Sequence, residues 1–517
     1  SAAFLALAHT HPVWNEQDTA AARAALRQLA PTREARAALA RTARERAWLD
    51  AVETLYDGDA PKAVRDTAYS RAMARLHAND PADPEAATFY ALSLLGLNQG
   101  VREPRAYAMA EALSDSVRRR HPRHPGALHY LIHAVDEPGS AARGLDAAAA
   151  YGALAPDASH AQHMTSHIFI ALGRWDDVVR ANLAAHRAQP AALHSFGHGT
   201  HWLAYGLVQQ GKVGAARAWV DSMLTYHRMV TSGQRRAVRG TRDADAYAVR
   251  MAASWVLDTD GWDTPLASAR FDTARFDVPA TRTLAEFLTG FAAARRAGRP
   301  VDLTAGSRAA DRALADSMLA RIAERNARAG TDGAARVTTR GEMEVMEQML
   351  RAELLVAAGR ADSAVVLLQH AAARLEALPF EFGPPATGKP PRERAAEILL
   401  IRGRLPEALA QLDSAERMYP GRARARHLRA RTLVRMGRLD EASRVYRELA
   451  ALWRGADATL PAREEVRWGS TVLPSIGADA SVRVDTVGYA NGALALRGRS
   501  TGPPRQAGTP RLSCCTA

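Results

Sequence analysis

Two stretches toward the C-terminal end of the sequence, Arg402-Gly-Arg-Leu-Pro-Glu-Ala408 and Met436-Gly-Arg-Leu-Asp-Glu-Ala442, decide the fold. In each of them a glycine, Gly403 or Gly437, stands between an apolar helical segment and a second amphipathic one. Glycine suits this place because the chain must leave one helix and reverse within a few residues, often through a left-handed backbone conformation. The pattern predicts pairs of helices that are joined by a glycine turn.

The same unit recurs earlier in the chain, at Ala171-Leu-Gly-Arg-Trp175, Gln210-Gly-Lys-Val213 and Ala358-Gly-Arg-Ala361. A helix pair that repeats every ~34 residues has the period of tetratricopeptide repeats (TPRs), and Gly403 and Gly437 are separated by this period. Gly173 and Gly211 are slightly further apart, which is consistent with a short insertion near Pro190. Because one pair cannot bury its apolar face alone, we expect stacked pairs: an all-α, right-handed α-solenoid of TPR-like helix pairs with an irregular C-terminal tail.

The composition agrees with a helical chain and excludes several other classes. Hydrophobic residues make up 47% of the sequence and aromatic residues only 6%, so that alanine-rich helices are favoured over a β-sandwich. The net charge is +13, but arginines are dispersed among Asp and Glu and form no dense basic face, so no nucleic-acid partner is expected. The sequence contains no run of about 18 apolar residues, so no membrane span is predicted. The only cysteines, Cys514 and Cys515, offer no thiolate site in the body of the chain.

Changes in this periodicity suggest four segments. We predict an N-terminal TPR-like array over 1–228, degenerate helical repeats over 229–345, clear TPR repeats over 346–453, and an irregular or disordered tail over 454–517. Within the tail, the segment that begins at Val482 has the alternation of a strand, and the residues from Thr501 onward have the composition of a disordered end.

Histidines are concentrated in the N-terminal part of the chain, where 14 of the 17 lie between His9 and His201. Spacings of three, four and seven residues place side chains on one face of a helix. Three consecutive first helices show such spacings, with His129 and His133 on one, His160, His163 and His167 on the next, and His198 and His201 on the third.

The repeat period relates these helical faces to one another. His129 and His163 are one TPR period apart, and so are His133 and His167. Equivalent positions of stacked repeats point the same way, so we expect a histidine-lined groove on the concave side. Neighbouring helices pack about 8–10 Å apart, close enough for imidazoles of two adjacent helices to hold one metal ion.

This arrangement predicts a candidate metal site. Imidazoles with a carboxylate and without a thiolate suit copper, zinc, iron or nickel. The alternative is that these rings hydrogen-bond one another, ordered water or a peptide carboxylate. The predicted metal ligands are His129, His133, His163 and His167, with Glu137, His9 and His11 as further candidates.

Three motifs together resemble a subgroup of bacterial TPR proteins over about residues 1–230. They are His9-Thr-His-Pro-Val-Trp14, His124-Pro-Gly-Ala-Leu-His-Tyr-Leu-Ile-His-Ala134 and His160-Ala-Gln-His-Met-Thr-Ser-His-Ile168. The resemblance implies an exported protein and a further repeat ahead of Ser1, so we expect the start of this chain to be processed or incomplete. It implies no reaction. The subgroup usually has proline where this chain has Thr165, which puts the start of that helix in doubt.

Three hypotheses for the function follow. The first is a TPR-type binding scaffold whose concave groove binds a protein or peptide partner, with or without a metal ion. The second is a histidine-coordinated metalloprotein or metalloenzyme, although no catalytic motif is present and no catalytic residue is predicted. The third is a structural subunit of a larger assembly. The predicted ligand-binding residues of the groove are Tyr90, Tyr130, His160, His198, His201 and Tyr205.

Overall fold

The computed structural model of the chain falls into two compact units. The N-terminal unit comprises Ser1–Leu172, Ala181–Pro190 and Pro379–Gly383, and the C-terminal unit comprises Gly173–Arg180, Ala191–Leu378 and Pro384–Ala517. The predicted first segment, 1–228, therefore spans parts of both units. The structure describes residues 6–7, 17–56, 58–98, 102–188, 197–235, 241–268, 271–299, 304–329, 337–473, 483–491 and 494–502.

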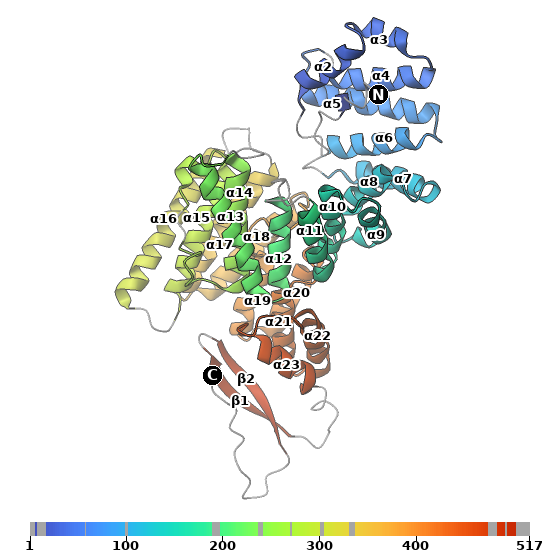
Figure 1. Cartoon of the computed structure of the whole chain (residues 1–517). Helices are drawn as coiled ribbons and strands as arrows, with labels where there is room; N and C mark the ends of the chain where they lie inside the picture. Colours follow the sequence, from blue (N-terminus) through green and yellow to red (C-terminus); the bar gives the residue numbers. More distant parts are fainter. Residues whose placement is uncertain are drawn as a thin grey trace, which may run out of the picture. The chain divides into compact units, whose positions relative to one another are not determined.

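The N-terminal unit is a succession of helices, drawn in blue to teal in Figure 1. Neighbouring helices pack against each other, and alternate helices such as α6 and α8, or α8 and α10, also touch, as stacked repeats do. Its helices are α2 (Thr19–Leu29), α3 (Arg33–Leu39), α4 (Ala43–Tyr56), α5 (Lys62–Asn79), α6 (Pro84–Leu97), α7 (Pro104–Arg120), α8 (Pro125–Val135), η1 (Ala141–Gly144), α9 (Leu145–Leu154) and α10 (Ser159–Ala171). Helix α11 (Trp175–Ala188) belongs to the C-terminal unit by its first residues and to the N-terminal unit by its last.

Local chemistry explains where the helices α6, α7 and α8 begin. Each has proline as its first residue, where the missing N–H is not needed and the fixed φ suits a helix. The preceding side chains, Asp83, Glu103 and His124, each accept a hydrogen bond from a backbone N–H of the first turn. The joints that carry these prolines therefore separate the helices.

The C-terminal unit contains the remaining helices and two strands. They are α12 (His198–Gln209), α13 (Val213–Thr231), α14 (Thr241–Thr259), η2 (Thr273–Arg275), α15 (Pro279–Ala297), α16 (Ala305–Ala329), α17 (Val337–Ala357), α18 (Ala361–Glu376), α19 (Pro391–Ile401), α20 (Leu405–Met418), α21 (Ala423–Arg435), α22 (Leu439–Leu452), α23 (Arg463–Thr471), β1 (Arg483–Asn491) and β2 (Leu494–Gly502). Together with the N-terminal unit they confirm the predicted all-α class of TPR-like helix pairs.

The predicted turn glycines adopt the left-handed conformation. Gly211, Gly359, Gly403 and Gly437 have φ between 70° and 78°. After each of them the next residue donates its N–H back into the last turn of the helix, as Arg360 does to the carbonyl of Leu355 at 2.8 Å. This hydrogen bond satisfies a carbonyl that the helix end leaves open, so the glycine ends one helix and starts the reversal.

Repeats that are far apart in sequence pack together within the C-terminal unit. The indole Nε1 of Trp175 donates to the carbonyl of Gly421 at 2.6 Å, and the indole Nε1 of Trp453 donates to the carbonyl of Gln209 at 3.0 Å. In an open solenoid each repeat contacts only its neighbours. This unit instead joins residues that are 246 and 244 positions apart.

Gly173 lies where the segment around Trp175 packs against Pro420 and Gly421, and a substitution there tests how close this packing is. We expect Gly173→Ala to lower the thermal stability more than Gly359→Ala. Both positions have positive φ, 66° and 76°, which disfavours any residue with a Cβ by about 1–2 kcal/mol. Only at Gly173 would the added Cβ lie 2.5 Å from a backbone oxygen, that of Pro420, whereas nothing lies within 4 Å at Gly359.

Thermal unfolding of the two variants, followed by circular dichroism beside the parent, checks this expectation. Equal losses of thermal stability in the two variants would show that the contact with Pro420 does not restrict Gly173.

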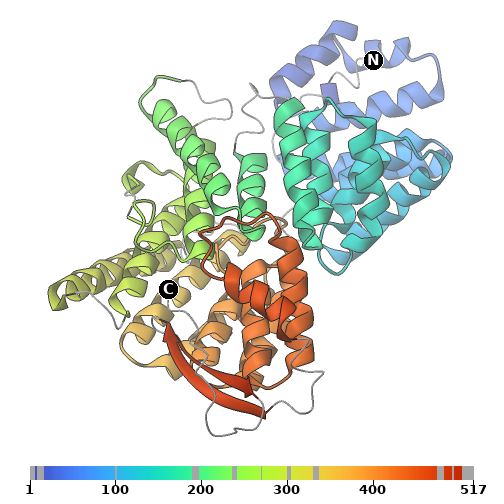
Figure 2. The ribbon, with the colours of Figure 1, turned by 60° about the horizontal axis from the view of Figure 1, so that its bottom comes forward.

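The tail is more regular than the sequence suggests. Residues 463–471 form helix α23, and β1 pairs with β2 as an antiparallel hairpin, with Arg483 opposite Gly502 and Asn491 opposite Leu494. The hairpin is the twisted red ribbon in Figure 2, and β1 contains the strand predicted after Val482. The predicted disorder beyond the hairpin lies outside the described residues. Among the helices that the structure describes, none is both long and apolar enough to cross a membrane.

Candidate metal centre

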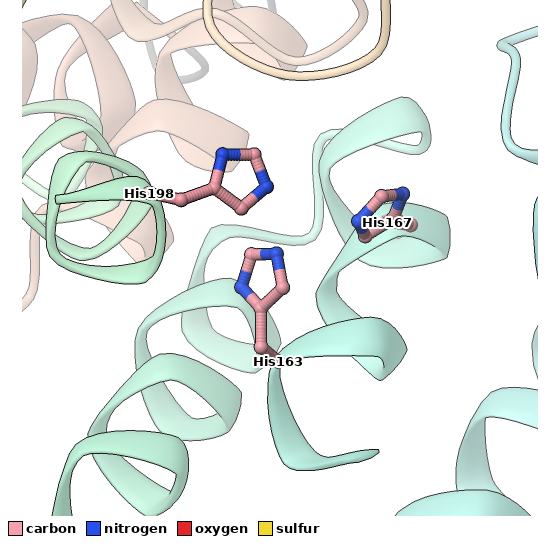
Figure 3. Close-up of side chains that lie close together, drawn as sticks. All are labelled: His163, His167 and His198. Carbon is pink, nitrogen blue, oxygen red and sulfur yellow. The ribbon is translucent and has the colours of Figure 1, made fainter. Parts of the chain in front are cut away.

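Helices α8 and α10 of the N-terminal unit carry the candidate ligands. His129 and His133 lie on α8, and His160, His163 and His167 lie on α10, which packs against α8. Figure 3 shows the imidazoles of His163 and His167, which project from the same helix.

Five imidazoles form a continuous row across these two helices. The ring centroids are 5.1 Å apart for His160 and His129, 5.1 Å for His129 and His133, 5.3 Å for His133 and His167, and 5.3 Å for His167 and His163. The predicted pair at equivalent repeat positions, His133 and His167, is therefore adjacent in the structure. This row of rings is called the histidine cluster below.

A buried carboxylate lies beside the middle of the histidine cluster. Asp136 directly follows α8 and is 1% exposed. Its Oδ2 lies 3.1 Å from Nδ1 of His167 and 3.4 Å from Nδ1 of His133, and its Oδ1 accepts a hydrogen bond from Nη1 of Arg102 at 2.9 Å. One ligand-type atom from each of Asp136, His133 and His167 lies within 4.8 Å of the other two, a spacing that a metal ion could bridge.

The pKa of Asp136 reflects these contacts. Burial alone would raise the pKa of this carboxyl, but hydrogen bonds from His133 and His167, together with the charge of Arg102, outweigh it and hold the pKa well below its usual range. Asp136 is therefore an anion that accepts hydrogen bonds and donates none.

The carboxylate fixes the tautomer of the two rings that face it. Because an ionised carboxylate only accepts, Nδ1 of His133 and Nδ1 of His167 must carry the proton, so the lone pair of each neutral ring lies on Nε2. The Nδ1 of His163 faces the side-chain oxygen of Asn182 at 2.7 Å, which favours the same tautomer. Outer hydrogen bonds of this kind commonly orient metal-binding histidines.

Three rings of the histidine cluster, those of His129, His163 and His167, are held in the neutral form that binds metals. Burial lowers the pKa of His129 and His163 well below the usual value, and neighbouring imidazoles lower it further; burial also lowers the pKa of His167, against the charge of Asp136. Nε2 of His129 and Nε2 of His133 are buried and have no hydrogen-bond partner in the described part of the chain. These two atoms are candidate ligands because a buried polar atom without a partner is costly.

Aromatic rings shield the histidine cluster. Phe382, which belongs to the N-terminal unit although it follows α18 in sequence, lies with its ring centroid 4.6 Å from that of His167 and 6.2 Å from that of His133. Tyr130 and Tyr151 stack on His129, with centroids 5.3 Å and 5.4 Å away. An apolar shell of this kind limits the access of water to a bound ion.

Two other predicted residues of this unit lie elsewhere. The carboxylate of Glu137 does not face the histidine cluster but accepts hydrogen bonds from Nε of Arg102 at 3.2 Å and from the hydroxyl of Ser140 at 3.0 Å. Tyr90 is half-buried, and its ring lies 6.2 Å from that of His77. Asp136 thus takes the place that the sequence suggested for Glu137.

The remaining predicted residues do not belong to the histidine cluster's unit or are not described. His198, which Figure 3 also draws, is carried by α12 of the C-terminal unit, as are His201 and Tyr205. His201 and Tyr205 are buried there, with His201 Nε2 at 3.1 Å from the hydroxyl of Ser254, so they present little surface to a ligand. His9 and His11 lie outside the described residues.

Sequence reasoning missed Asp136, Arg102, Asn182 and Phe382. Asp136 could have been found, because it is three residues after His133 and so lies close to the same helical face. Arg102 and Phe382 leave no such signal, since they come from other segments of the chain.

Comparison with known proteins agrees with the repeat architecture. The tetratricopeptide repeat family matches residues 399–452, which contain α20, α21 and α22. This match shows a repeat of the TPR type within residues 399–452. No curated protein sequence matches the chain.

Solved structures of other helical-repeat proteins align with long stretches of this chain at low identity. The human IFIT1 dimer with m7Gppp-AAAA is 12% identical over 89% of this chain and 87% of its own, with a TM-score of 0.32. Yeast Tom70 is 11% identical over 80% and 93%, with a TM-score of 0.31. The P58(IPK) TPR domain is 13% identical over 76% and 98%, with a TM-score of 0.23.

Proposed function

We propose that this chain is a TPR-type scaffold whose N-terminal unit binds a transition-metal ion in the histidine cluster. One observation carries the proposal: imidazoles of two packed helices converge around a buried carboxylate, and the Nε2 atoms of His129 and His133 are buried without a hydrogen-bond partner among the described residues. A metal ion would satisfy these atoms.

The donor set limits which ion fits. His133 and His167 are the central ligands, and His163 and His129 stand next to them in the row. Nitrogen donors without thiolates suit copper, zinc, iron or nickel, whereas calcium and magnesium require oxygen ligands. A bound ion would supply Lewis acidity or, if it is copper or iron, electron transfer.

A hydrogen-bonded cluster without metal is the competing interpretation. In that case no described residue of the chain would bind Nε2 of His129 or Nε2 of His133, and a buried nitrogen that is left without any partner costs about 1–3 kcal/mol. A bound ion removes that cost, and Asp136 against two Nδ1 atoms is an arrangement that metal-binding histidines commonly have.

We also propose a protein or peptide partner, with the TPR-type repeats as the supporting observation. Stacked helix pairs expose long surfaces that suit such ligands. The histidine motifs quoted above support a place in the bacterial TPR subgroup that they resemble.

The metal proposal is tested by the metal content of the full chain, purified without a histidine tag and measured by mass spectrometry before and after incubation with copper, zinc, iron and nickel salts. We expect near-stoichiometric metal in the parent. The double substitution His133→Ala/His167→Ala is expected to abolish it, because it removes both central ligands.

The matched control replaces two helical histidines of the C-terminal unit, His227→Ala/His427→Ala, and should keep the metal. Circular dichroism establishes that all variants are folded. A parent that takes up none of the four metals, or a cluster variant that binds as much as the control, would exclude the proposed site.

A further inference from the structure

Arg102 has an unusual backbone conformation next to the histidine cluster. Its φ is 49°, and among the described residues only one other non-glycine residue, Asp260, has a positive φ. A residue with a Cβ is disfavoured there, and such strain persists only where the surroundings demand it. The positive φ of Arg102 therefore indicates that its surroundings hold the residue in this conformation.

The side chain of Arg102 is fixed by three contacts. Its Nη1 donates to Oδ1 of Asp136 at 2.9 Å, its Nε donates to Oε2 of Glu137 at 3.2 Å, and its guanidinium lies 4.5 Å from the ring centroid of Tyr107. The side chain is only 11% exposed. These contacts hold the planar guanidinium in one orientation, and its hydrogen bond to Oδ1 in turn orients the carboxylate of Asp136.

The charge of Arg102 also decides what Asp136 can do. A metal ion bound directly to Asp136 would share this small carboxylate with a guanidinium that already occupies Oδ1, and the two positive charges would repel each other at short range in a buried place. Asp136 is instead well placed to accept hydrogen bonds, and its Oδ2 faces Nδ1 of both His133 and His167.

We infer that Arg102 is a positioning residue of the metal centre: it holds Asp136 as an outer hydrogen-bond acceptor, so that His133 and His167 bind the ion through Nε2. The inference rests on the proposed metal function and makes the ligand set one of imidazole nitrogens. The carboxylate stays outside the coordination shell and orients two of its ligands.

The first test reads the tautomers in the metal-free protein. The full chain labelled with ¹⁵N-histidine is compared by NMR with His133→Asn and His167→Asn to assign the two rings. We expect both rings to be protonated at Nδ1 in the parent and to become tautomer mixtures in Arg102→Gln. Arg102→Lys, which keeps the charge, should restore the Nδ1 form in part.

The second test measures affinity with Zn²⁺ as the probe, by competition with a chelator. We expect Arg102→Gln to bind Zn²⁺ about 10–100-fold more weakly than the parent at unchanged stoichiometry, as loss of an outer-sphere partner does. Arg102→Lys should recover part of this loss. Arg143→Gln is the matched control, because Arg143 of the same unit pairs with Glu111 and Ser140, and among the described residues it hydrogen-bonds neither Asp136 nor a ring of the histidine cluster. It should bind like the parent.

The outcomes separate this inference from the proposed function. A parent that binds no Zn²⁺ or other metal overturns the proposed function, whatever the tautomers are. A parent that binds Zn²⁺ through Nδ1 of either ring, or an Arg102→Gln variant with parental tautomers and affinity, overturns the role of Arg102. Weakened binding in Arg102→Gln with shifted tautomers, and neither effect in Arg143→Gln, supports it.

Discussion

Replacing Arg422 by methionine is expected to destabilise the chain by about 3–5 kcal/mol, because it removes one partner of a buried ion cluster. Arg422 is 1% exposed and reaches three other helices of the C-terminal unit. Its Nε donates to Glu393 at 2.9 Å, its Nη2 donates to Asp258 at 2.5 Å, and its Nη1 donates to the hydroxyl of Tyr205. Methionine fills a similar space but leaves two buried carboxylates without this cation.

Chemical denaturation of the full chain measures the loss. The control is Arg438→Met, because Arg438 pairs with Glu441 at the surface, and solvent-exposed pairs contribute little. Adding Glu393→Gln and Asp258→Asn to the Arg422 variant should recover part of the stability, since it removes the stranded charges. A loss no larger than that of the control would mean that Arg422 does not hold the four helices together.

The second large effect concerns pH and involves His201 of the C-terminal unit. Burial, reinforced by the charge of Arg250, lowers the pKa of His201 to about 3 from the usual 6.5. The groups that face this ring are the hydroxyl of Ser254, the ring of Tyr247 and the charge of Arg250. None of these is an anion that would stabilise a protonated imidazole.

The direction of this pH effect on stability depends on which state, folded or unfolded, takes up a proton at His201. Above pH 6.5 His201 is neutral in both the folded and the unfolded chain, so its contribution to stability is fully present. As the pH falls from 6.5 toward 3, only the unfolded chain takes up this proton, and stability falls by about 1.4 kcal/mol per pH unit. Across the whole window the loss amounts to about 4–5 kcal/mol.

The contribution is isolated by comparing the parent with His201→Gln, which stays neutral and can still hydrogen-bond Ser254. The difference in unfolding free energy between the two should fall with that slope as the solution is acidified. His370→Gln, at an exposed position of α18, is the control for removing an imidazole from the surface of the chain. Parallel pH profiles for the parent and His201→Gln would contradict the burial effect.

Much of the fold could be predicted because its signals are local. Gly359, Gly403 and Gly437 were identified from the turn pattern alone, and each has the left-handed backbone that a helix end needs. The β-hairpin of residues 483–502 was only partly foreseen. A strand shows its own alternation, but its partner and register depend on another segment of the chain.

The candidate site was predicted in part for the same reason. Helical spacing and the repeat period place His133 beside His167 on stacked helices, and their centroids are indeed 5.3 Å apart. The period did not predict that His129 would contact His160, which is not at the equivalent repeat position, with centroids 5.1 Å apart. A shift by part of a helical turn changes which rings meet, and that shift is set by how the two helices pack.

The sequence by itself determined the helix pairs, their turns and the crowding of imidazoles on α8 and α10, because each depends on a short-range periodicity of the chain. Only the tertiary structure decided that Asp136 and Arg102 orient these rings, and that Arg422 joins α12, α14 and α19. Such contacts link residues that are 31, 34 and 164 positions apart. No pattern of residue types marks those pairs in the sequence. They meet because the close packing of the helices determines which residues surround each buried charge.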